Sequence, residues 1–336
     1  MRISEEIRAA VRTPIKGDAL MLGPSFNPGD FDSHAVDCPF VFSVGGKVGM
    51  TIVGWDGVGY QTGLSWLGED DVWSRPQLVF PRDAGSKHRR YNAALTSILR
   101  DNELRGSGEL VSVDGWYYGT YHAYPNPGYE EGSGVIGIVR SRDLLTWEEY
   151  GDLLDPAEGA AWERGGLYKS WLMRADGRFW LFYNAKNQPT GDWREQTGAA
   201  VSADLRDWRR VTDQPLLING AEGAIDDRFA SDPCVLRHGD VWIMFYFGLS
   251  SDGRARDAYA VSTDLLAWQK GDEVLVDVGP SGAIDSQYSH KPAVIFRNGK
   301  LEHYYCAVSP LPTPVELAGY SQPELRGIAV ARSAPE

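Results

Sequence analysis

The sequence is poor in cysteine and has no long hydrophobic run. Its three cysteines, Cys38, Cys234 and Cys306, include no CxxC pair, so disulfides and a zinc site are both disfavoured. Two of them lie in apolar strand-like runs, which predicts buried, reduced thiols. No stretch approaches the roughly 18 apolar residues of a membrane helix, and the N-terminus lacks the apolar core of a signal peptide. We therefore expect a cytoplasmic protein that has no membrane partner.

Positive charge is also scarce. The chain of 336 residues has 33 basic and 46 acidic residues and a net charge of −13, which disfavours a nucleic-acid partner because phosphate binding needs a basic surface. Hydrophobic residues at 43% and charged residues at 24% are typical of a soluble globular protein. Aromatic residues are abundant at 12%, which favours a β-rich core and is compatible with rings that stack on sugars. The composition leaves the oligomeric state open.

A repeated motif organises the chain. The pattern S-x-D-L-x-x-W occurs three times, ending at Trp147, Trp208 and Trp268, at intervals of 61 and 60 residues. A looser copy, SWLGEDDVW, ends at Trp73. Self-similarity at a fixed period indicates a repeat architecture.

A second motif precedes each copy of the first. It begins P-x-V at Pro39, Pro233 and Pro292, and continues through a glycine into an alternating aromatic run. Two degenerate copies, from Glu109 and Ser170, lack the proline. Each copy is typical of a β-hairpin with a tight turn at the glycine. A third strand of small residues follows each hairpin, and the D-L-x-x-W turn would lead into a fourth.

Together these motifs predict five radially repeated four-stranded units, which are the blades of a β-propeller. The predicted fold is all-β, a five-bladed β-propeller of four-stranded antiparallel blades, with a short N-terminal helix ending near Pro14, in a single domain over residues 1–336. The last unit stops before its fourth strand, so residues 17–30 are expected to complete it and to cover the exposed edge. The expected blades are residues 37–80, 107–155, 167–218, 231–277 and 290–333.

The five blades, the S-x-D-L-x-x-W turns and the Asp-Pro or Lys-Pro at blade starts resemble the five-bladed propeller glycosidases, the relatives of glycoside hydrolase families 43, 32, 68, 117 and 130. The resemblance runs from about Asp30 to Ser333. There is no full match to the NDPNG motif of family 32 or to the family 130 phosphorylase signature. The resemblance implies glycosyl hydrolysis or transfer by carboxylates around a central funnel, and it does not fix the family.

Carboxylates at the starts of the innermost strands are candidate catalytic groups because these strand starts converge on the funnel. Glu195 is a further candidate because it begins a third strand, which runs in the same direction as the first and starts at the same end. Glycoside cleavage needs an acid for the leaving oxygen and a second carboxylate as nucleophile or base. At Asp37 the family pattern is broken, since Cys38 separates it from Pro39, and Asp32 is therefore its rival. A turn cap for Asp37 and a solvated loop for Asp101 are the competing structural interpretations. The catalytic candidates are Asp37, Asp101, Glu163, Glu195 and Asp232.

Polar and aromatic residues near the same strand starts are the substrate-binding candidates. They are Asp32, His34, Trp55, Gln61, His122, Tyr124, Lys169, Gln196, His290 and Lys291. For Gln61 and Gln196, a consensus turn position is the competing interpretation. The Pro/Gly-rich loop that carries His122, Tyr124, Tyr129 and Glu130 suits a rim that contacts substrate.

These features predict a glycoside hydrolase that removes a terminal sugar from a short oligosaccharide. Furanosides such as arabinofuranosides or fructofuranosides are a common substrate class among the relatives that the sequence resembles. Exo action is expected because residues 81–106 and 309–325 would wall off a pocket. No cofactor is expected to be required, and no EF-hand-like motif supports a central Ca²⁺. The alternatives are a phosphorylase of the family 130 kind, binding phosphate through Arg100, His290, Lys291 and Arg326, and a non-catalytic carbohydrate-binding propeller.

Overall fold

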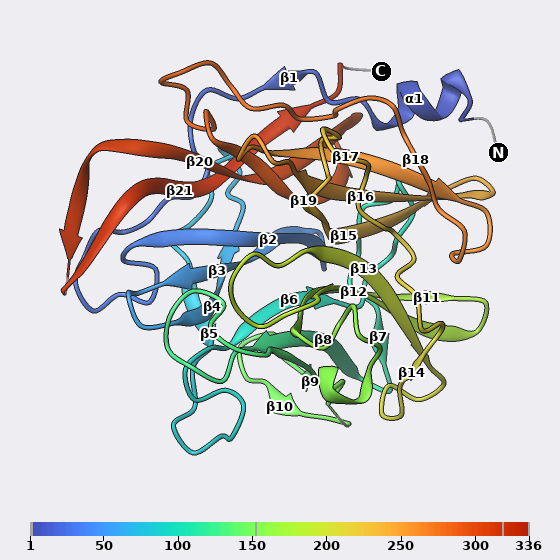
Figure 1. Cartoon of the computed structure of the whole chain (residues 1–336), viewed down its shortest axis with the longest axis horizontal. Helices are drawn as coiled ribbons and strands as arrows, with labels where there is room; N and C mark the ends of the chain where they lie inside the picture. The colour runs from blue at the N-terminus through green and yellow to red at the C-terminus, as the bar shows by residue number, and fades with distance from the viewer. Residues whose placement is uncertain (1–2, 152, 318, 335–336) are drawn as a thin grey trace.

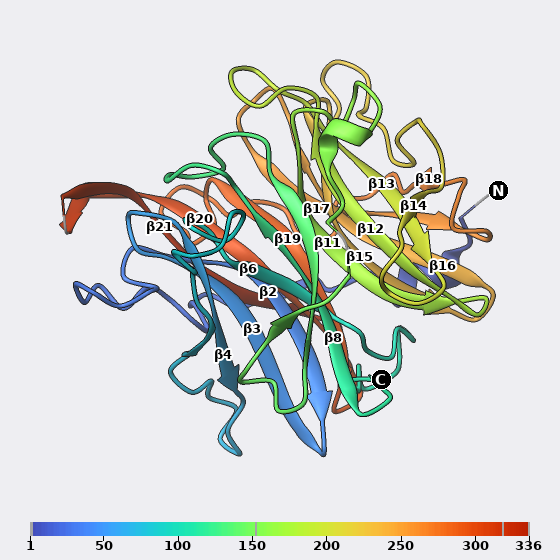
Figure 2. The ribbon, with the colours of Figure 1, turned by 90° about the horizontal axis from the view of Figure 1, so that it is seen from below.

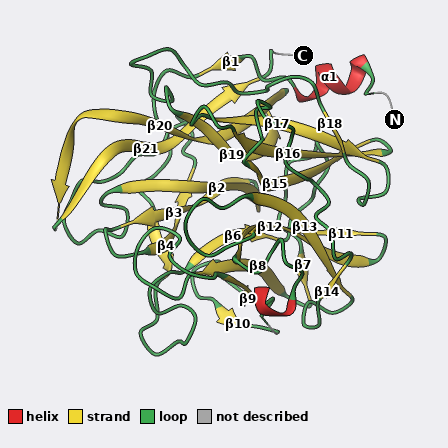
Figure 3. Ribbon diagram, in the orientation of Figure 1, coloured by secondary structure: helices red, strands yellow, loops and turns green. Residues whose placement is uncertain are grey.

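The computed structural model describes residues 3–151, 153–317 and 319–334, and these residues form mainly strands and the loops between them (Figure 1 and Figure 3). Within these ranges the helical elements are α1 (Glu5–Val11) and one short 3-10 turn, η1 (Pro156–Glu158). Ser4 begins α1 by accepting a 3.3 Å hydrogen bond from the backbone N–H of Ile7. The predicted short N-terminal helix is therefore confirmed. No helix in the described part of the chain has the length and apolarity needed to cross a membrane.

The strands from β2 onward form five consecutive antiparallel groups, which we number one to five along the chain. Group one has the order β2-β3-β4-β5, and group two has the order β6-β8-β9-β10, with β7 also paired to β8. The strands of these two groups are β2 (Ala35–Val44), β3 (Lys47–Trp55), β4 (Tyr60–Trp66), β5 (Gln77–Phe80), β6 (Ala94–Ile98), β7 (Ser112–Val113), β8 (Trp116–Ala123), β9 (Val135–Ser141) and β10 (Glu148–Glu149).

Groups three to five repeat this pattern. In each, a long hairpin pairs with a third strand and then with a short fourth strand. Their strands are β11 (Gly166–Ala175), β12 (Arg178–Lys186), β13 (Glu195–Ser202), β14 (Arg209–Arg210), β15 (Phe229–His238), β16 (Val241–Leu249), β17 (Ala255–Ser262), β18 (Gln269–Lys270), β19 (Tyr288–Arg297), β20 (Lys300–Leu317) and β21 (Tyr320–Arg332).

The first strands of the groups meet in a closed ring. β2 contacts β6, β6 contacts β11, β11 contacts β15, β15 contacts β19, and β19 contacts β2 again. The other strands of each group lie outward from this ring (Figure 1 and Figure 2). This radial arrangement is a propeller-like fold, and it brings the first strands of all five groups together at the centre.

The N-terminal segment completes group five. β1 (Ile15–Lys16) pairs antiparallel with β21, with Ile15 opposite Arg332, and an isolated bridge joins Leu22 to Ile328. The sequence placed this pairing at residues 17–30, and the regular strand lies two residues earlier. The chain therefore closes its last group with residues from its opposite end.

Group two differs from the prediction, which began it at residue 107. Its first strand is β6 (Ala94–Ile98), which pairs with the second half of β8, while β7 (Ser112–Val113) pairs with the beginning of β8. The predicted strand from Glu109 corresponds only to β7, and the partner of β8 is divided into β6 and β7 with residues 99–111 between them. Residues 81–106 are consequently not an insertion that walls a pocket, because they contain the inner strand itself.

A β-bulge interrupts the first strand of every group at the same place. The register shifts lie between Asp37 and Phe40, Leu95 and Ser97, Tyr168 and Ser170, Ser231 and Cys234, and His290 and Ala293. Three bulge residues, Cys38, Asp232 and Lys291, have positive φ angles of 47°, 57° and 65°. Bulges re-aim side chains next to functional sites. The equivalent bulge positions are Cys38, Thr96, Lys169, Asp232 and Lys291.

The S-x-D-L-x-x-W motif forms the turn before each short fourth strand, as predicted. In the first copy, Asp143 Oδ1 accepts hydrogen bonds from the backbone N–H groups of Leu145 and Thr146. The same bonds recur around Asp204 and Asp264. These backbone hydrogen bonds lower the pKa of each of the three aspartates below its ordinary value. The aspartate of the motif is therefore a turn residue.

Candidate active site

A cavity of about 160 Å³ opens at the end of the ring where the bulges lie. Four of the five bulge residues, all but Thr96, line it. Its carboxylates are Glu130, Glu195 and Asp232, and its cations are Lys169, Lys291 and Arg326. Its aromatic wall is made of Tyr60, Tyr124, Tyr168, Phe229, Phe247 and Tyr288. The cavity therefore combines apolar rings with a few convergent charges, as small-molecule sites commonly do.

Seven residues that the sequence singled out meet in this cavity. They are His122, Tyr124, Lys169, Glu195, Asp232, His290 and Lys291. They come from groups two to five: five of them lie near strand starts, whereas His122 and Tyr124 reach the cavity from the end of β8. The sequence-predicted residues that do not line the cavity are Asp32, His34, Asp37, Trp55, Gln61, Asp101, Glu163 and Gln196.

Glu195, the first residue of β13, has the environment of a general acid. Its carboxylate is buried and accepts hydrogen bonds from Asn184 Nδ2 (3.0 Å), Ser231 Oγ (2.9 Å) and Trp193 Nε1 (2.9 Å). Burial, and next the negative charge of Glu130, raise the pKa of Glu195 to about 7. The group can therefore hold a proton near neutral pH and release it to a substrate oxygen.

Glu130 brings a second carboxylate to the cavity from the loop between β8 and β9. Its side chain is half-buried, and no hydrogen bond to its carboxylate occurs among the described residues. Its backbone has a φ of 51°, which is uncommon for a non-glycine residue and is concentrated at functional sites. Lys186 Nζ fixes this conformation by donating a 3.0 Å hydrogen bond to the carbonyl oxygen of Glu130.

The loop that carries Glu130 is anchored by aromatic packing. The Tyr129 ring lies 4.1 Å from the Trp55 ring and 5.5 Å from the Tyr60 ring. Trp55 is only 1% exposed, so it supports the loop from behind rather than stacking on substrate. The predicted stacking role of Trp55 is therefore wrong, although the residue lies close behind the cavity.

Asp232 and Lys169, at the bulges of groups four and three, face each other. Lys169 Nζ is 3.8 Å from Asp232 Oδ2, a distance beyond a hydrogen bond, and both atoms are buried without a hydrogen-bond partner. Burial raises the pKa of Asp232 to about 6, against the opposing charges of Lys169 and Lys291. Two buried charged groups that lack partners are expected to bind something that enters the cavity.

Asp37 does not reach the cavity, because Cys38 takes the bulge position beside it. Asp37 Oδ2 instead accepts hydrogen bonds from Lys291 Nζ at 2.8 Å and from Arg326 Nη1 at 3.0 Å. Burial alone would raise the pKa of Asp37, but the charges of Lys291 and Arg326 hold it well below its ordinary value. Asp37 therefore neutralises and orients two cations of the cavity.

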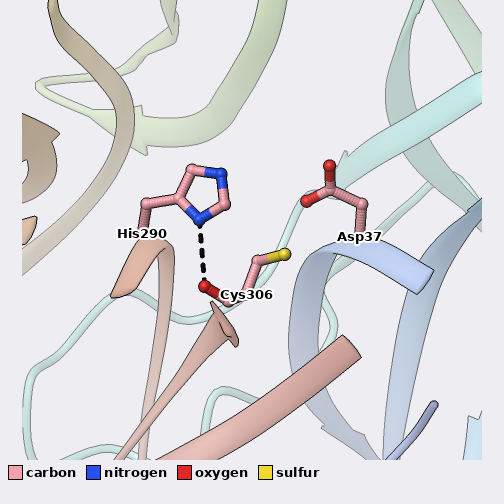
Figure 4. A group of neighbouring side chains, drawn as sticks. All are labelled: Asp37, His290 and Cys306. Atoms are coloured by element: carbon pink, nitrogen blue, oxygen red, sulfur yellow. Dashed lines mark hydrogen bonds between the residues drawn. The ribbon is translucent and has the colours of Figure 1, made fainter. Parts of the chain in front are cut away.

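Asp37, His290 and Cys306 form a buried group whose potential ligand atoms lie within 4.8 Å of one another (Figure 4). His290 Nδ1 is hydrogen-bonded at 2.9 Å to the backbone oxygen of Cys306, as the figure shows. A metal ion here would meet the positive charges of Lys291 and Arg326, which already bind Asp37. Burial also raises the pKa of the Cys306 thiol well above its ordinary value, which opposes thiolate ligation. This donor set does not fit a metal ion.

Glu163 lies outside the cavity in a structural contact that the repeat explains. Its carboxylate, fully buried, accepts from Tyr183 OH (2.9 Å) and pairs with Arg210 Nε (2.7 Å). The corresponding carboxylates of groups four and five, Asp226 and Asp285, bind a tyrosine 20 residues later and a lysine of the short fourth strand. Glu163 therefore ties the strands of group three together, and its predicted catalytic role is wrong.

Asp101 lies in the loop between β6 and β7, and its Oδ1 accepts a 3.2 Å hydrogen bond from the N–H of Glu103. This loop follows the inner strand rather than preceding it, so Asp101 is at the wrong end of the strand to reach the cavity. The preceding Arg100 is buried and donates to the carbonyl oxygens of Val41 and Val294. The solvated-loop interpretation of Asp101 is the better one.

Asp32 and His34 have structural partners of their own. Asp32 is buried and pairs with Arg75 at 2.9 Å. His34 Nε2 is hydrogen-bonded at 2.9 Å to the carbonyl oxygen of Leu317, and its ring meets Tyr320 edge-on. The His34 contacts hold the projecting part of the β20–β21 hairpin, which extends beyond the ring in Figure 1 and Figure 2. The described residues of the predicted wall, 309–317 and 319–325, belong to this hairpin and do not line the cavity, although Arg326 at its base does.

Gln61 and Gln196 are each the second residue of a third strand, β4 and β13, so the competing interpretation of a turn position is wrong, but neither residue lines the cavity. Gln61 Oε1 accepts from the N–H of Arg82, and Gln196 Oε1 accepts from the N–H of Asn219, both at 3.2 Å. Both bonds fix the loop that follows the outer strands of their groups. The shared Q-T-G sequence is therefore a feature of the repeat and not of substrate binding.

Sequence reasoning missed part of the cavity. Glu130 was placed on a rim loop but not proposed as an acid, because nothing in a Pro/Gly-rich loop distinguishes one acidic residue from its neighbour Glu131. Arg326 was considered only for phosphate. Tyr60, Tyr168, Asn184 and Tyr288 lie at strand ends and carry no pattern of their own. For Cys38 the sequence held a signal, because Pro39 aligns with Pro233 and Pro292. This alignment makes Cys38, and not Asp37, the equivalent of Asp232 in the repeat.

Comparisons with known proteins agree with this architecture. The family model described as "Glycosyl hydrolases family 32 N-terminal domain" matches residues 107–284, more than half of the chain. A structure described as a complex of BT0996 and RGII is 29% identical, with a TM-score of 0.80 over 98% of this chain and 94% of the other. A second structure, described as "Glycoside hydrolase", is 28% identical, with a TM-score of 0.81 over 100% and 97%.

More distant structures share the fold. A structure from work on "the GH130 family of mannoside phosphorylases" that "contains glycoside hydrolases that target beta-1,2 mannosidic linkages in Candida mannan" is 15% identical, with a TM-score of 0.65 over 95% of this chain and 94% of the other. No curated protein matches the sequence. The match over more than half of the sequence decides the family: the chain therefore belongs to the glycosyl hydrolase family 32 N-terminal domain family and is a glycosidase of the propeller superfamily.

Proposed function

We propose that this glycosidase removes a single terminal sugar, with Glu195 as the general acid and Glu130 as the second carboxylate. The observation that carries the proposal is the pairing of these two groups in one cavity. Glu195 is buried and its pKa is raised to about 7, partly by the charge of Glu130, which carries no competing hydrogen bond among the described residues. Glycoside cleavage requires two carboxyl groups in different environments, one that holds a proton as the acid and one that acts as nucleophile or base.

The chemistry follows from these positions. Glu195 gives its proton to the glycosidic oxygen as the bond between that oxygen and the anomeric carbon breaks, and the aglycone leaves as an alcohol. Glu130 can bond to the anomeric carbon, in which case Glu195 then takes a proton from the water that breaks this bond and releases the sugar. Alternatively, Glu130 takes a proton from the water that attacks the anomeric carbon directly. Hydrogen bonds from Asn184, Ser231 and Trp193 stabilise the Glu195 carboxylate after the proton has left. The carboxylates supply every proton movement, so the proposal requires no cofactor.

The size of the cavity supports exo action on a terminal sugar. Its volume of about 160 Å³ is below the roughly 300–1,000 Å³ of pockets that hold drug-sized ligands. Furanosides are the proposed substrate class, on the resemblance to the five-bladed propeller glycosidases. The similar structure described as an RGII complex makes RGII oligosaccharides the first natural substrates to assay.

The fold can be stated more finely as part of the proposal. We interpret the five antiparallel groups as the blades of a five-bladed propeller, each with four main strands, in one domain that spans the chain. The closed contact cycle of the first strands and the completion of group five by β1 support this interpretation.

A screen of aryl glycosides, with arabinofuranosides and fructofuranosides first, tests the function directly. Each is assayed with and without phosphate, using wild type and the Glu195→Gln and Glu130→Gln variants. The proposal expects release of the aglycone without phosphate and a loss of about 100-fold or more in kcat for each variant. Activity that depends on phosphate would instead favour the phosphorylase. Full activity in Glu195→Gln would reject the acid assignment.

A further inference from the structure

Several buried polar atoms around the cavity have no hydrogen-bond partner within the described part of the chain. Lys169 Nζ is a donor, and Asp232 Oδ2 and Asn184 Oδ1 are acceptors. His122 Nδ1 is also without a partner, and burial lowers the pKa of His122 to about 3, so the ring is neutral. All four residues line the same cavity, although they belong to three different groups of strands. Orphan polar atoms of this kind are costly unless a ligand or water completes them.

The geometry of Lys169 and Asp232 selects the ligand group. Their atoms lie 3.8 Å apart, and a hydroxyl oxygen about 2.8 Å from each fits between them. That oxygen would accept from Lys169 Nζ, and its hydrogen would donate to Asp232 Oδ2. A hydroxyl does both at once without carrying a charge, whereas a carboxylate only accepts, and either a carboxylate or a phosphate would place its negative charge against Asp232 and Glu130.

We propose, building on the proposed function, that Lys169 and Asp232 form a clamp that binds one hydroxyl of a neutral terminal sugar and excludes uronic acids and phosphate from this position. The clamp joins the bulges of β11 and β15, so its spacing is set by the ring of inner strands and not by a mobile loop. Asn184 extends the site toward the acid. Its Nδ2 holds Glu195, while its Oδ1 is free to accept from a neighbouring hydroxyl.

The cations around the cavity support a neutral ligand. Lys291 and Arg326 are both bound to Asp37, and Lys186 is bound to the carbonyl oxygen of Glu130. Lys169 is thus the lining cation whose ammonium group has no hydrogen bond among the described residues, and its nearest charge is Asp232. Because Asp37 already balances part of the charge of Lys291 and Arg326, an anionic ligand between Lys169 and Asp232 would meet one cation without a hydrogen bond and the opposing carboxylate of Asp232.

The test is a substrate-by-variant cycle. The best aryl glycoside from the screen is compared with its analogues in which one hydroxyl at a time is replaced by hydrogen, and with its uronic acid form. The variants are Asp232→Asn, which keeps the shape of the side chain, and Lys169→Met with Asp232→Asn, which removes both charges together. Lys270→Met is the matched control, because Lys270 pairs with the buried Asp226 outside the cavity.

In wild type, one deoxy analogue is expected to lose about 10- to 100-fold in kcat/KM, as for a hydrogen bond to a charged group. The double variant should lose a similar factor in kcat/KM on the parent glycoside, and its kcat/KM on the deoxy analogue should be little lower than that of wild type. Lys270→Met should keep the wild-type ratio of kcat/KM between the parent glycoside and the analogue. The uronic acid form should be the poorest wild-type substrate. Equal deoxy penalties in wild type and in both variants, or a preference for the uronic acid, would overturn the clamp.

Failure of the clamp and failure of the proposed function give different results. If wild type cleaves the glycosides but the deoxy penalties do not depend on Lys169 and Asp232, only the clamp is wrong. If no glycoside is cleaved, titration calorimetry measures the affinity of each variant for the free monosaccharides and for their deoxy forms. The ratio of these affinities then replaces the ratio of kcat/KM. Thermal unfolding of each variant confirms that it is folded. If the double variant is unfolded, the deoxy penalty of Asp232→Asn alone is compared with that of wild type.

Discussion

Lys291 Nζ donates a 2.8 Å hydrogen bond to Asp37 Oδ2, and this ion pair joins the first strand of group five to the first strand of group one. Arg326, at the base of the β20–β21 hairpin, binds the same oxygen from the other side. The contact therefore closes the central ring at the point where the first and last groups meet, and it holds two cations at the cavity.

Replacing Asp37 with asparagine should cost stability. The change leaves Lys291 and Arg326 without their buried counter-charge, and breaking such a pair costs about 3–5 kcal/mol. The folded pKa of Asp37 is well below its ordinary value, so its contribution is complete above the unfolded pKa of about 3.9 and is lost as the pH falls toward the folded pKa. Urea unfolding at pH 7 and at pH 3 measures the free energy of unfolding of wild type and of Asp37→Asn. The difference between the two proteins should be smaller at pH 3 than at pH 7.

Asp114→Asn is the matched control for this experiment. Asp114 is an exposed turn residue with a φ of 51°, a conformation that asparagine tolerates. It should unfold within about 0.5 kcal/mol of wild type at both pH values. A stability of Asp37→Asn equal to that of the control would show that the ion pair does not hold the ring.

The alkaline limb of the pH profile should report Glu195. The reaction needs its protonated form, so kcat/KM should fall as the pH rises through about 7. The 2.9 Å hydrogen bond from Trp193 Nε1 stabilises the ionised carboxylate and lowers its pKa. Trp193→Phe removes this bond and keeps a ring beside Lys186, so the limb should move to higher pH. Trp162→Phe, whose indole donates to the backbone oxygen of Asp213, should leave the limb in place. A shift to lower pH would contradict the assignment.

Glu163→Gln should separate stability from activity. The carboxylate is buried against Arg210 and Tyr183, and an unpaired Arg210 should cost about 3–5 kcal/mol. Because the residue does not line the cavity, kcat per folded molecule should remain close to wild type. Calorimetric unfolding measures the stability, and activity divided by the concentration of titrated active sites gives kcat per folded molecule. A large loss of kcat without a loss of stability would return Glu163 to the catalytic machinery.

Lys16→Met should weaken the closure of group five. Lys16 on β1 lies 2.5 Å from the buried Asp285, whose carboxylate also accepts from Tyr305 OH. Loss of a partly exposed, charged hydrogen bond of this kind should lower stability by about 1.5–3 kcal/mol. Thermal unfolding measures the change, and Lys47→Met, at the exposed first residue of β3, is the control. An unchanged melting temperature in Lys16→Met would argue that β1 contributes little to the ring.

The repeat made much of the fold predictable, and its exceptions set the limits. Pro39, Pro233 and Pro292 marked three inner strands correctly, and the D-L-x-x-W turns form as expected. Group two was misplaced because its inner strand is divided and the visible motif belongs to the second piece. Hydrophobic alternation detects a strand but cannot show that two short strands share one partner.

The site was less predictable, because it depends on the direction of single side chains. Asp37 and Cys38 are neighbours, yet the bulge turns only Cys38 into the cavity. Glu195 could be expected from its place at the start of a strand in the repeat. Glu130 could not, since its position depends on a strained loop held by Lys186 and by the packing of Tyr129 on Trp55.

The pairing of β1 with β21 also bears on how the protein reaches its native state. Ile15 meets Arg332, so β1 finds its partner only after all of the intervening groups and β21 itself have been synthesised. Contacts of such high sequence separation form slowly, and the uncovered strand edge is prone to aggregation in the meantime. Ring closure is consequently expected to be the slow step of folding, and proteins truncated before β21 should depend on chaperones to stay in solution.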